Sequence, residues 1–434
     1  MSSTASTADA VTAAMPRPPS GRFDMLDGVR GWAALSVVLF HIFWEIFGAL
    51  VPAFRNPVTG FLFDGQLAVC VFFVLSGEAL SASFFAGKGD ALTVRLAIKR
   101  YPRLATPILA ASLVIFALDR LDLVFSQQAA LIVHRPVWMG GWLAVPLTFA
   151  DTLRYSLIDV FTSAGADNAI NPILWTMRVE LPGSFVVFAI LLIWKRFSRP
   201  RTLLLSLFVV ALAAPTGSTA NFLSCFFAGV AFADWRARGL FAAWGRRFVW
   251  PSLAAIGVIA AADGILHCFG WQPGKTAFAI VLMLAVHASP PLVAFFSGRL
   301  SRALGRISFP LYLIQFPVLL SATSWLIVRA GAAGPPSLFA IWGISLASVA
   351  GCLLAAIAFS PIETLTRRLG DALVAVVGRA VRRWPGGDPL GENQPKRKAE
   401  ITLPPIASRK LCSPAAPSAA PTTTISGMRC SSRG

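Results

Sequence analysis

The sequence predicts an all-α polytopic membrane protein with about ten transmembrane helices and both termini in the cytoplasm. Three observations predict this fold class: only 13% of the 434 residues are charged, 56% are hydrophobic, and the apolar residues fall in long runs. Soluble globular proteins carry about 25% charged residues, because charges are costly in hydrocarbon but not in water. A lipid bilayer is therefore the first partner that the composition implies.

The apolar runs predict the number of helices, and the basic clusters between them predict their direction across the membrane. A hydrocarbon core of about 30 Å takes about 20 helical residues to cross. Basic clusters separate the runs, and the segments expected inside hold 31 of the 38 Lys and Arg residues, which is typical of cytoplasmic loops. The expected spans are 31–51, 66–86, 104–118, 174–194, 202–215, 220–235, 248–264, 276–290, 307–328 and 338–360.

Composition divides the chain into three parts. We expect a disordered tail over 1–21, a membrane domain over 22–370, and a basic, largely disordered tail over 371–434. The tails are rich in small and polar residues and in proline, and cannot bury enough apolar area to offset the entropy of ordering. Within the domain, the expected outer segment 119–173 contains VWMGGWLAVPL. We expect it to be partly embedded, because Trp favours the membrane interface.

The net charge of +18 does not indicate a nucleic-acid-binding protein. The basic residues lie between apolar runs and in the tails, which argues against nucleic acid as a partner. The six cysteines form no CxxC pair and no Cys/His cluster. We therefore expect no metal site and no permanently bound cofactor.

The first expected span carries two ionisable residues in LDGVRGWAALSVVLFHIF (26–43). Arg30 and His41 are eleven residues apart, so a helix places both on one face, about 16 Å apart along its axis. Arg30 would lie at the cytoplasmic boundary and His41 about halfway across. Ionisable residues inside a membrane are functional by default, but a snorkelling arginine and a histidine that packs a neighbouring helix are the alternatives.

Two arginines follow in RLAIKRYPRLATP (95–107). Arg100 and Arg103 share a helix face at this spacing. A pair of guanidinium groups at the cytoplasmic surface can clamp phosphates through bidentate hydrogen bonds. The alternative is that they only set the topology.

Three more polar residues interrupt apolar runs. Glu180 lies in NPILWTMRVELPGSF (171–185), at the outer opening of the fourth expected span, where it could face a cavity or pair with another charge. Glu78 could pair with an arginine or be a protonated acid. Gln315 needs a partner inside the membrane, or a substrate.

Five stretches in one order resemble the acyltransferase 3 family of integral membrane O-acyltransferases. They are LDGVRGWAALSVVLFH, FFVLSG, KRYPR, LWTMRVE and ISFPLYLIQFPV, and the resemblance spans about residues 22–370. It implies an enzyme that moves an acyl group, such as acetyl, from cytoplasmic acyl-CoA to a hydroxyl. The implied acceptor is a glycan, a glycolipid or another extracytoplasmic molecule, and the implied location is a bacterial inner membrane.

Carried across residue by residue, the resemblance marks five residues as functional. It implies that His41 and Glu180 are catalytic and that Arg30, Arg100 and Arg103 bind acyl-CoA. We expect His41 to act as general base, because imidazole exchanges a proton near neutral pH. An acyl-histidine intermediate is the alternative to direct transfer. Family members often have His at the position of Gln315 and an apolar residue at that of Glu78.

Two other functions are compatible with the same residues. A transporter or flippase of lipid-linked glycans would also have charges at mid-membrane and broken helices. The hydropathy pattern has no matching halves, which argues against it. In a non-enzymatic scaffold, Arg30 and His41 would only pack helices.

Overall fold

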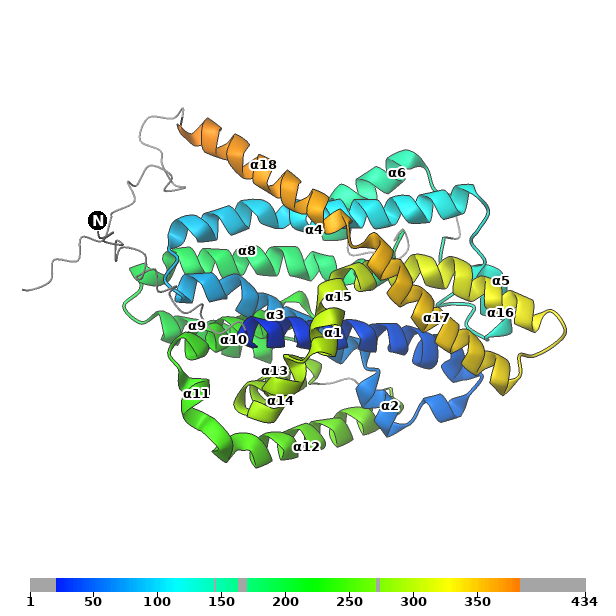
Figure 1. Cartoon of the computed structure of the whole chain (residues 1–434), viewed down its shortest axis with the longest axis horizontal. Coiled ribbons are helices and arrows are strands. Elements are labelled where there is room, and N and C mark those ends of the chain that lie inside the picture. The colour runs from blue at the N-terminus through cyan, green and yellow to red at the C-terminus, as the bar shows by residue number, and fades with distance from the viewer. Residues whose placement is uncertain (1–20, 144–145, 163–169, 271–273, 383–434) are drawn as a thin grey trace, which may run out of the picture. The chain divides into compact units, whose positions relative to one another are not determined.

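The computed structural model describes residues 21–382, except for 144–145, 163–169 and 271–273 (Figure 1). These residues belong to one compact unit and contain helices but no strand. The expected tail over 1–21 lies almost wholly outside the described residues. The described helices extend to Arg382, so the first part of the expected tail over 371–434 is helical.

Each of the ten apolar runs forms a helix. The first helix, α1, continues as a π-helix over Phe40–Ile46. The ten helices are α1 (Gly21–Leu39), α3 (Gly65–Phe85), α4 (Asp90–Arg120), α8 (Met177–Ile193), α9 (Pro200–Ala213), α10 (Thr219–Ala237), α12 (Val249–Cys268), α13 (Lys275–Ala288), α15 (Arg299–Val318) and α17 (Leu338–Phe359).

Shorter helices and one long terminal helix complete the described part of the chain. α18 runs beside α4 in Figure 1 and is tied to it by an ion pair between Asp371 and Lys99. The others are α2 (Pro57–Leu62), α5 (Ser126–Ile132), α6 (Phe149–Arg154), α7 (Val160–Thr162), α11 (Leu240–Trp244), α14 (Pro290–Phe296) and α16 (Ser324–Gly331), and α18 covers Ile362–Arg382.

Membrane crossing is supported by length and apolarity, although not for every helix. Seven described segments are long and apolar enough to cross a bilayer, and α13 with α14, bent by 99°, could form one more. α9 is apolar but has only 14 residues. The chain therefore has the helices of a multi-pass membrane protein, while the count of ten and the cytoplasmic termini remain predictions.

Glycines set how closely the first helix packs. A Cβ at Gly31 of α1 would lie 2.4 Å from the backbone nitrogen of Gly305 on α15. A Cβ at Gly305 would lie 2.3 Å from the carbonyl oxygen of Asp27. Small residues allow such backbone contact between membrane helices. The glycines of LDGVRG and of GRISF therefore fix α1, which carries Arg30 and His41, against α15.

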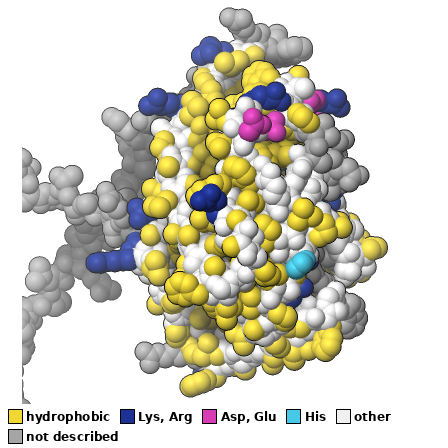
Figure 2. Space-filling model, turned by 90° about the vertical axis from the view of Figure 1, so that its right-hand side faces the viewer, with side chains coloured by type: hydrophobic (Ala, Val, Ile, Leu, Met, Phe, Trp, Pro, Cys, Tyr) yellow, Lys and Arg dark blue, Asp and Glu magenta, His cyan; other side chains and the backbone are white. Residues whose placement is uncertain are grey.

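Charge is sparse on the face at the right-hand end of Figure 1. Figure 2 shows that apolar side chains cover much of this face and that acidic side chains gather beside basic ones near the top. Exposed apolar residues at this end include Phe339 at the start of α17, which is 90% exposed. Such a surface fits a lipid or interfacial environment.

Candidate active site

His41 lies in the π-helical turn that ends the first helix. Its Nδ1 lies 2.7 Å from the carbonyl oxygen of Val37. A carbonyl only accepts, so Nδ1 carries the hydrogen and the neutral ring has its lone pair on Nε2. No described residue is hydrogen bonded to Nε2. Single π-helical turns inside helices are frequent at functional sites, and this one fixes the tautomer of a buried imidazole.

Glu180 is held by α3 and α4 from its place on α8. The Ser76 hydroxyl donates to Glu180 Oε1 at 2.6 Å, and Arg100 Nη2 forms an ion pair with the same oxygen. Arg100 Nε also donates to Ser184 Oγ at 2.8 Å. Arg100 and Glu180 are both buried, at 8% and 7% exposure. Each charge of this buried pair is therefore matched by the other and by hydroxyl groups.

Arg30 and Arg103 complete a cluster with this pair. The charges of Arg103 and Glu180 act on Arg30, and those of Arg103 and Arg30 act on Arg100. Arg30 pairs with Asp27 at 3.1 Å, while Arg103 is exposed. The structure thus brings together four of the five residues expected from sequence: Arg30, Arg100, Arg103 and Glu180.

The two ends of the first helix have different chemistry. Arg30 belongs to the arginine cluster, and His41 lies eleven residues further along, about 16 Å at the rise of a helix. Glu180 was expected at the outer opening of the fourth span, and the structure places it within the arginine cluster. We define the candidate active site as this cluster together with His41.

Sequence reasoning missed the residues that cover His41. The Trp138 indole stacks on the His41 imidazole, with ring centroids 5.8 Å apart and planes 24° from parallel. Arg135 of the same segment forms an ion pair with Glu45, in the π-helical turn of His41. The Trp-rich composition of residues 137–147 was the available signal, but it did not identify the histidine as the contact.

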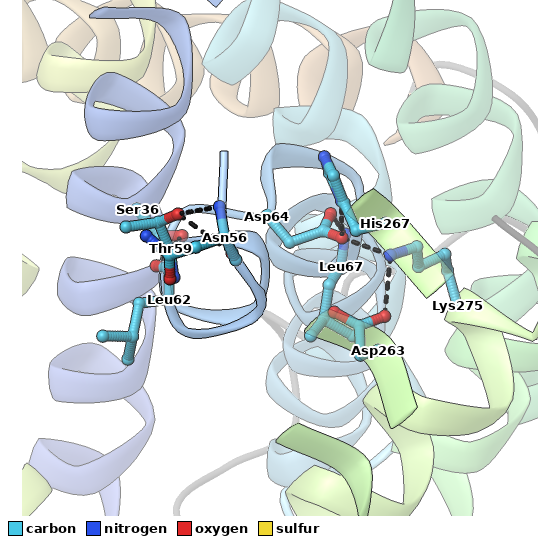
Figure 3. A network of polar contacts seen from close by, with 9 residues as sticks. All are labelled: Ser36, Asn56, Thr59, Leu62, Asp64, Leu67, Asp263, His267 and Lys275. Atoms are coloured by element: carbon cyan, nitrogen blue, oxygen red, sulfur yellow. Dashed lines mark hydrogen bonds and ion pairs between the residues drawn. The ribbon is translucent and has the colours of Figure 1, made fainter. Parts of the chain in front are cut away.

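Sequence reasoning also missed a buried ionic network, drawn in Figure 3. Asp64 caps α3 by accepting from the Leu67 amide at 2.7 Å, and His267 Nδ1 lies 2.7 Å from its other oxygen, Oδ2. Lys275 Nζ contacts Asp64 and lies 2.7 Å from Asp263 Oδ1. All four ionisable side chains are at most 4% exposed. Asp263 and His267, four residues apart in a predominantly apolar helix, were the signal that the sequence offered.

Glu78 and Gln315 have different surroundings. Glu78 is fully buried between Arg236, at 2.7 Å, and His287, at 2.9 Å. The expected pairing with an arginine is therefore present. Gln315 donates from Nε2 to the Tyr312 carbonyl at 3.1 Å, and its buried Oε1 has no hydrogen-bond partner among the described residues.

Known proteins resemble this chain over most of the described helices. Residues 23–359 match the family described as an acyltransferase domain. The O-acetyltransferase PaAT-1 of Phomopsis amygdali is 25% identical over 357 residues, which are 68% of this chain and 71% of that protein. No solved structure matches. Because the match covers most of the chain and includes the arginine cluster and His41, the protein belongs to the acyltransferase 3 family and is an acyltransferase of groups other than aminoacyl groups.

Proposed function

We propose that this enzyme transfers an acyl group, such as acetyl, from acyl-CoA to a hydroxyl of a glycan or another extracytoplasmic acceptor, with His41 as general base. One observation carries the proposal. The first helix carries Arg30, which forms a cluster with Arg100 and Arg103 of α4, and further along it carries an imidazole whose Nδ1 is fixed by Val37 and whose Nε2 has no described partner. This arrangement links an anion-binding cluster and a base through one helix.

The proposed reaction balances without another reagent. Nε2 of His41 takes the proton of the acceptor hydroxyl while its oxygen attacks the thioester carbonyl. The C–S bond then breaks, and the imidazolium returns the proton to the leaving CoA sulfur. Direct transfer needs one base only. An acyl-histidine intermediate, with the acyl group on Nε2, is the alternative path.

The arginines divide the work at the donor end. The guanidinium of Arg100 is already bound by Glu180 and Ser184. We therefore assign phosphate binding to Arg30, which is half-buried, and to Arg103, which is exposed, with Arg100 and Glu180 orienting them. Acyl-CoA is a substrate in this proposal, and no bound cofactor is required.

The class of acceptor is inferred from similarity to known proteins. The name of the Phomopsis amygdali relative, O-acetyltransferase, supports a hydroxyl acceptor for this chain. The glycan class and a bacterial inner membrane come from the family resemblance. Mass spectrometry of surface glycans and glycolipids, from cells with and without the protein, tests this part. An acyl-sized mass difference would identify the group and the acceptor, whereas lipid-linked glycan transport without acyl-CoA dependence would favour the flippase.

The test of the base is His41→Ala in membranes with matched protein levels. Labelled acetyl-CoA is supplied, and both CoA thiol release and acetyl ester formation are measured. We expect a loss of about 10²- to 10⁴-fold, as is usual when a general base is removed. Trp250→Ala is the control, because Trp250 is 79% exposed on α12, away from the proposed site. Retained activity in His41→Ala would contradict the assignment.

A further inference from the structure

One face of the proposed base is covered by a residue distant in sequence. Trp138 lies in residues 133–143, a run of turns after α5, and its indole is stacked on the His41 imidazole. His41 is 9% exposed, and Trp138 is partly buried. The indole is larger than the imidazole, so at an interplanar angle of 24° it extends past the edge of the smaller ring.

The segment that carries Trp138 is fastened to the same turn as His41. Arg135 forms an ion pair with Glu45, four residues after His41. The Arg135 guanidinium lies 5.8 Å from the centroid of the Trp138 ring. Val133 and Met139 are fully buried on either side. The position of the indole over the imidazole is therefore fixed by charge pairing and by packing.

A row of rings continues from Trp138 to α15. The Trp138 and Trp142 rings are 4.5 Å apart, and Trp142 is 4.9 Å from Phe316, measured between centroids. Edge-to-face contacts of this kind favour one arrangement of the rings. The Trp138 indole is therefore held in place from behind by two buried rings.

The direction of proton transfer gives the Trp138 indole a role. The lone pair of Nε2 lies in the imidazole plane, so a hydroxyl must approach along the edge of the ring. The carbon skeleton of the acceptor then lies against the protruding indole. We propose that Trp138 is the acceptor wall of His41: a positioning residue that aligns an acceptor with an apolar C–H face, such as a sugar ring, and excludes water. This inference rests on the proposed function of His41.

The first test needs no acceptor. Diethyl pyrocarbonate modifies unprotonated imidazole nitrogens, and the chain has only four histidines to map by mass spectrometry. The exposed His134 serves as internal reference. Trp138→Ala should increase the modification rate of His41 relative to His134 several-fold, while Trp138→Phe should stay near wild type. Trp250→Ala, which removes a 79% exposed indole from α12, should change nothing. An unchanged rate in Trp138→Ala would overturn the proposal.

The second test measures water exclusion. Acetyl-CoA is given to the purified protein without an acceptor, and CoA thiol release reports hydrolysis. Trp138→Ala should raise hydrolysis several-fold, Trp138→Phe should restore the low rate, and Trp138→Ala combined with His41→Ala should fall to background. An increase in thiol release that persists in the double variant without His41 would overturn the proposed role of Trp138. If every variant fails to release thiol, the proposed function is contradicted, while the modification rates still decide the accessibility of His41.

A third variant protects the test from misfolding. Glu45→Gln keeps the shape of the side chain and removes the charge that holds Arg135. It should increase the modification of His41 in the same direction as Trp138→Ala, by a smaller factor, because the apolar anchors remain. A rate equal to wild type in both Glu45→Gln and Trp138→Ala would show that the segment does not cover the base.

Discussion

Two of the buried histidines contact the ring of Phe40, and they are held in opposite ways. The ring of Phe40 lies 5.3 Å from His41 and 6.0 Å from His267. Nδ1 of His41 meets a backbone carbonyl, whereas Nδ1 of His267 meets the carboxylate of Asp64. Among the described residues neither ring has a hydrogen bond at Nε2, and only His267 belongs to an ionic network.

The difference teaches which of the two can act as a base. A carboxylate behind a histidine is the arrangement of catalytic triads, because it stabilises the imidazolium. Here Lys275 contacts the same oxygen of Asp64 and also pairs with Asp263, so His267 is one member of a buried ionic network that joins three segments of the chain. His41 takes part in no ion pair among the described residues, and its hydrogen bond to a backbone carbonyl fixes the tautomer. We therefore assign proton transfer to His41 and helix joining to His267.

The largest expected effect separates the two histidines by activity. His41→Gln should reduce acetyl transfer about 10²- to 10⁴-fold, because the proton acceptor is lost. His267→Gln should keep most of the activity of each folded molecule, because its ring does not exchange the reaction's proton. Thiol release from acetyl-CoA, normalised to folded protein by size-exclusion chromatography, makes the comparison. Equal losses of activity in the two variants would place His267 in the reaction and contradict the different roles assigned to the two histidines.

The next effect concerns stability. Asp64→Asn should lower the free energy of unfolding by about 1–3 kcal/mol, because its hydrogen bonds to the His267 ring and to a backbone amide are weakened and Lys275 keeps only one carboxylate partner. The matched control is Asp371→Asn, whose exposed partner is Lys99 and which should leave the unfolding temperature unchanged. Thermal unfolding in detergent, followed by circular dichroism, measures both. An Asp64→Asn protein as stable as the control would contradict a structural role for the network.

The sequence predicted the helices far better than it predicted their contacts. The position of each apolar run is a local property, since about 20 apolar residues predict a helix wherever they occur. The family order marked Arg30, Arg100, Arg103 and Glu180 as functional residues, but it did not predict that Glu180 lies among the arginines. Which residue faces which is a tertiary property, so nothing local revealed that Arg100 meets Glu180.

The sequence did not reveal the roles of Lys275 and Trp138 for the same reason, because their contacts depend on the tertiary structure. Lys275 stands near the end of a predicted span, where a basic residue looks like a loop charge, and its two carboxylate partners come from other segments. Trp138 was interpreted as an interfacial residue from its composition alone. Its contact with His41 depends on a run of turns with no periodic pattern, including a left-handed backbone at His134. Sequence periodicity cannot place such a segment.

The smallest expected effect extends the comparison to two arginines of α4. Arg100 is bound by Glu180 and Ser184, whereas Arg103 is exposed. Arg103→Ala should raise the KM for acetyl-CoA about 10- to 100-fold with little change in kcat, because it removes a charged hydrogen bond worth about 1.5–3 kcal/mol. Arg100→Ala should instead lower the yield of folded protein, because Glu180 loses its cation. Donor saturation curves for Arg103→Ala and Arg103→Lys, beside folding yields for Arg100→Ala and the double change with Glu180→Gln, separate the roles. An unchanged KM in Arg103→Ala would remove this residue from the donor site and leave Arg30 as its main cation.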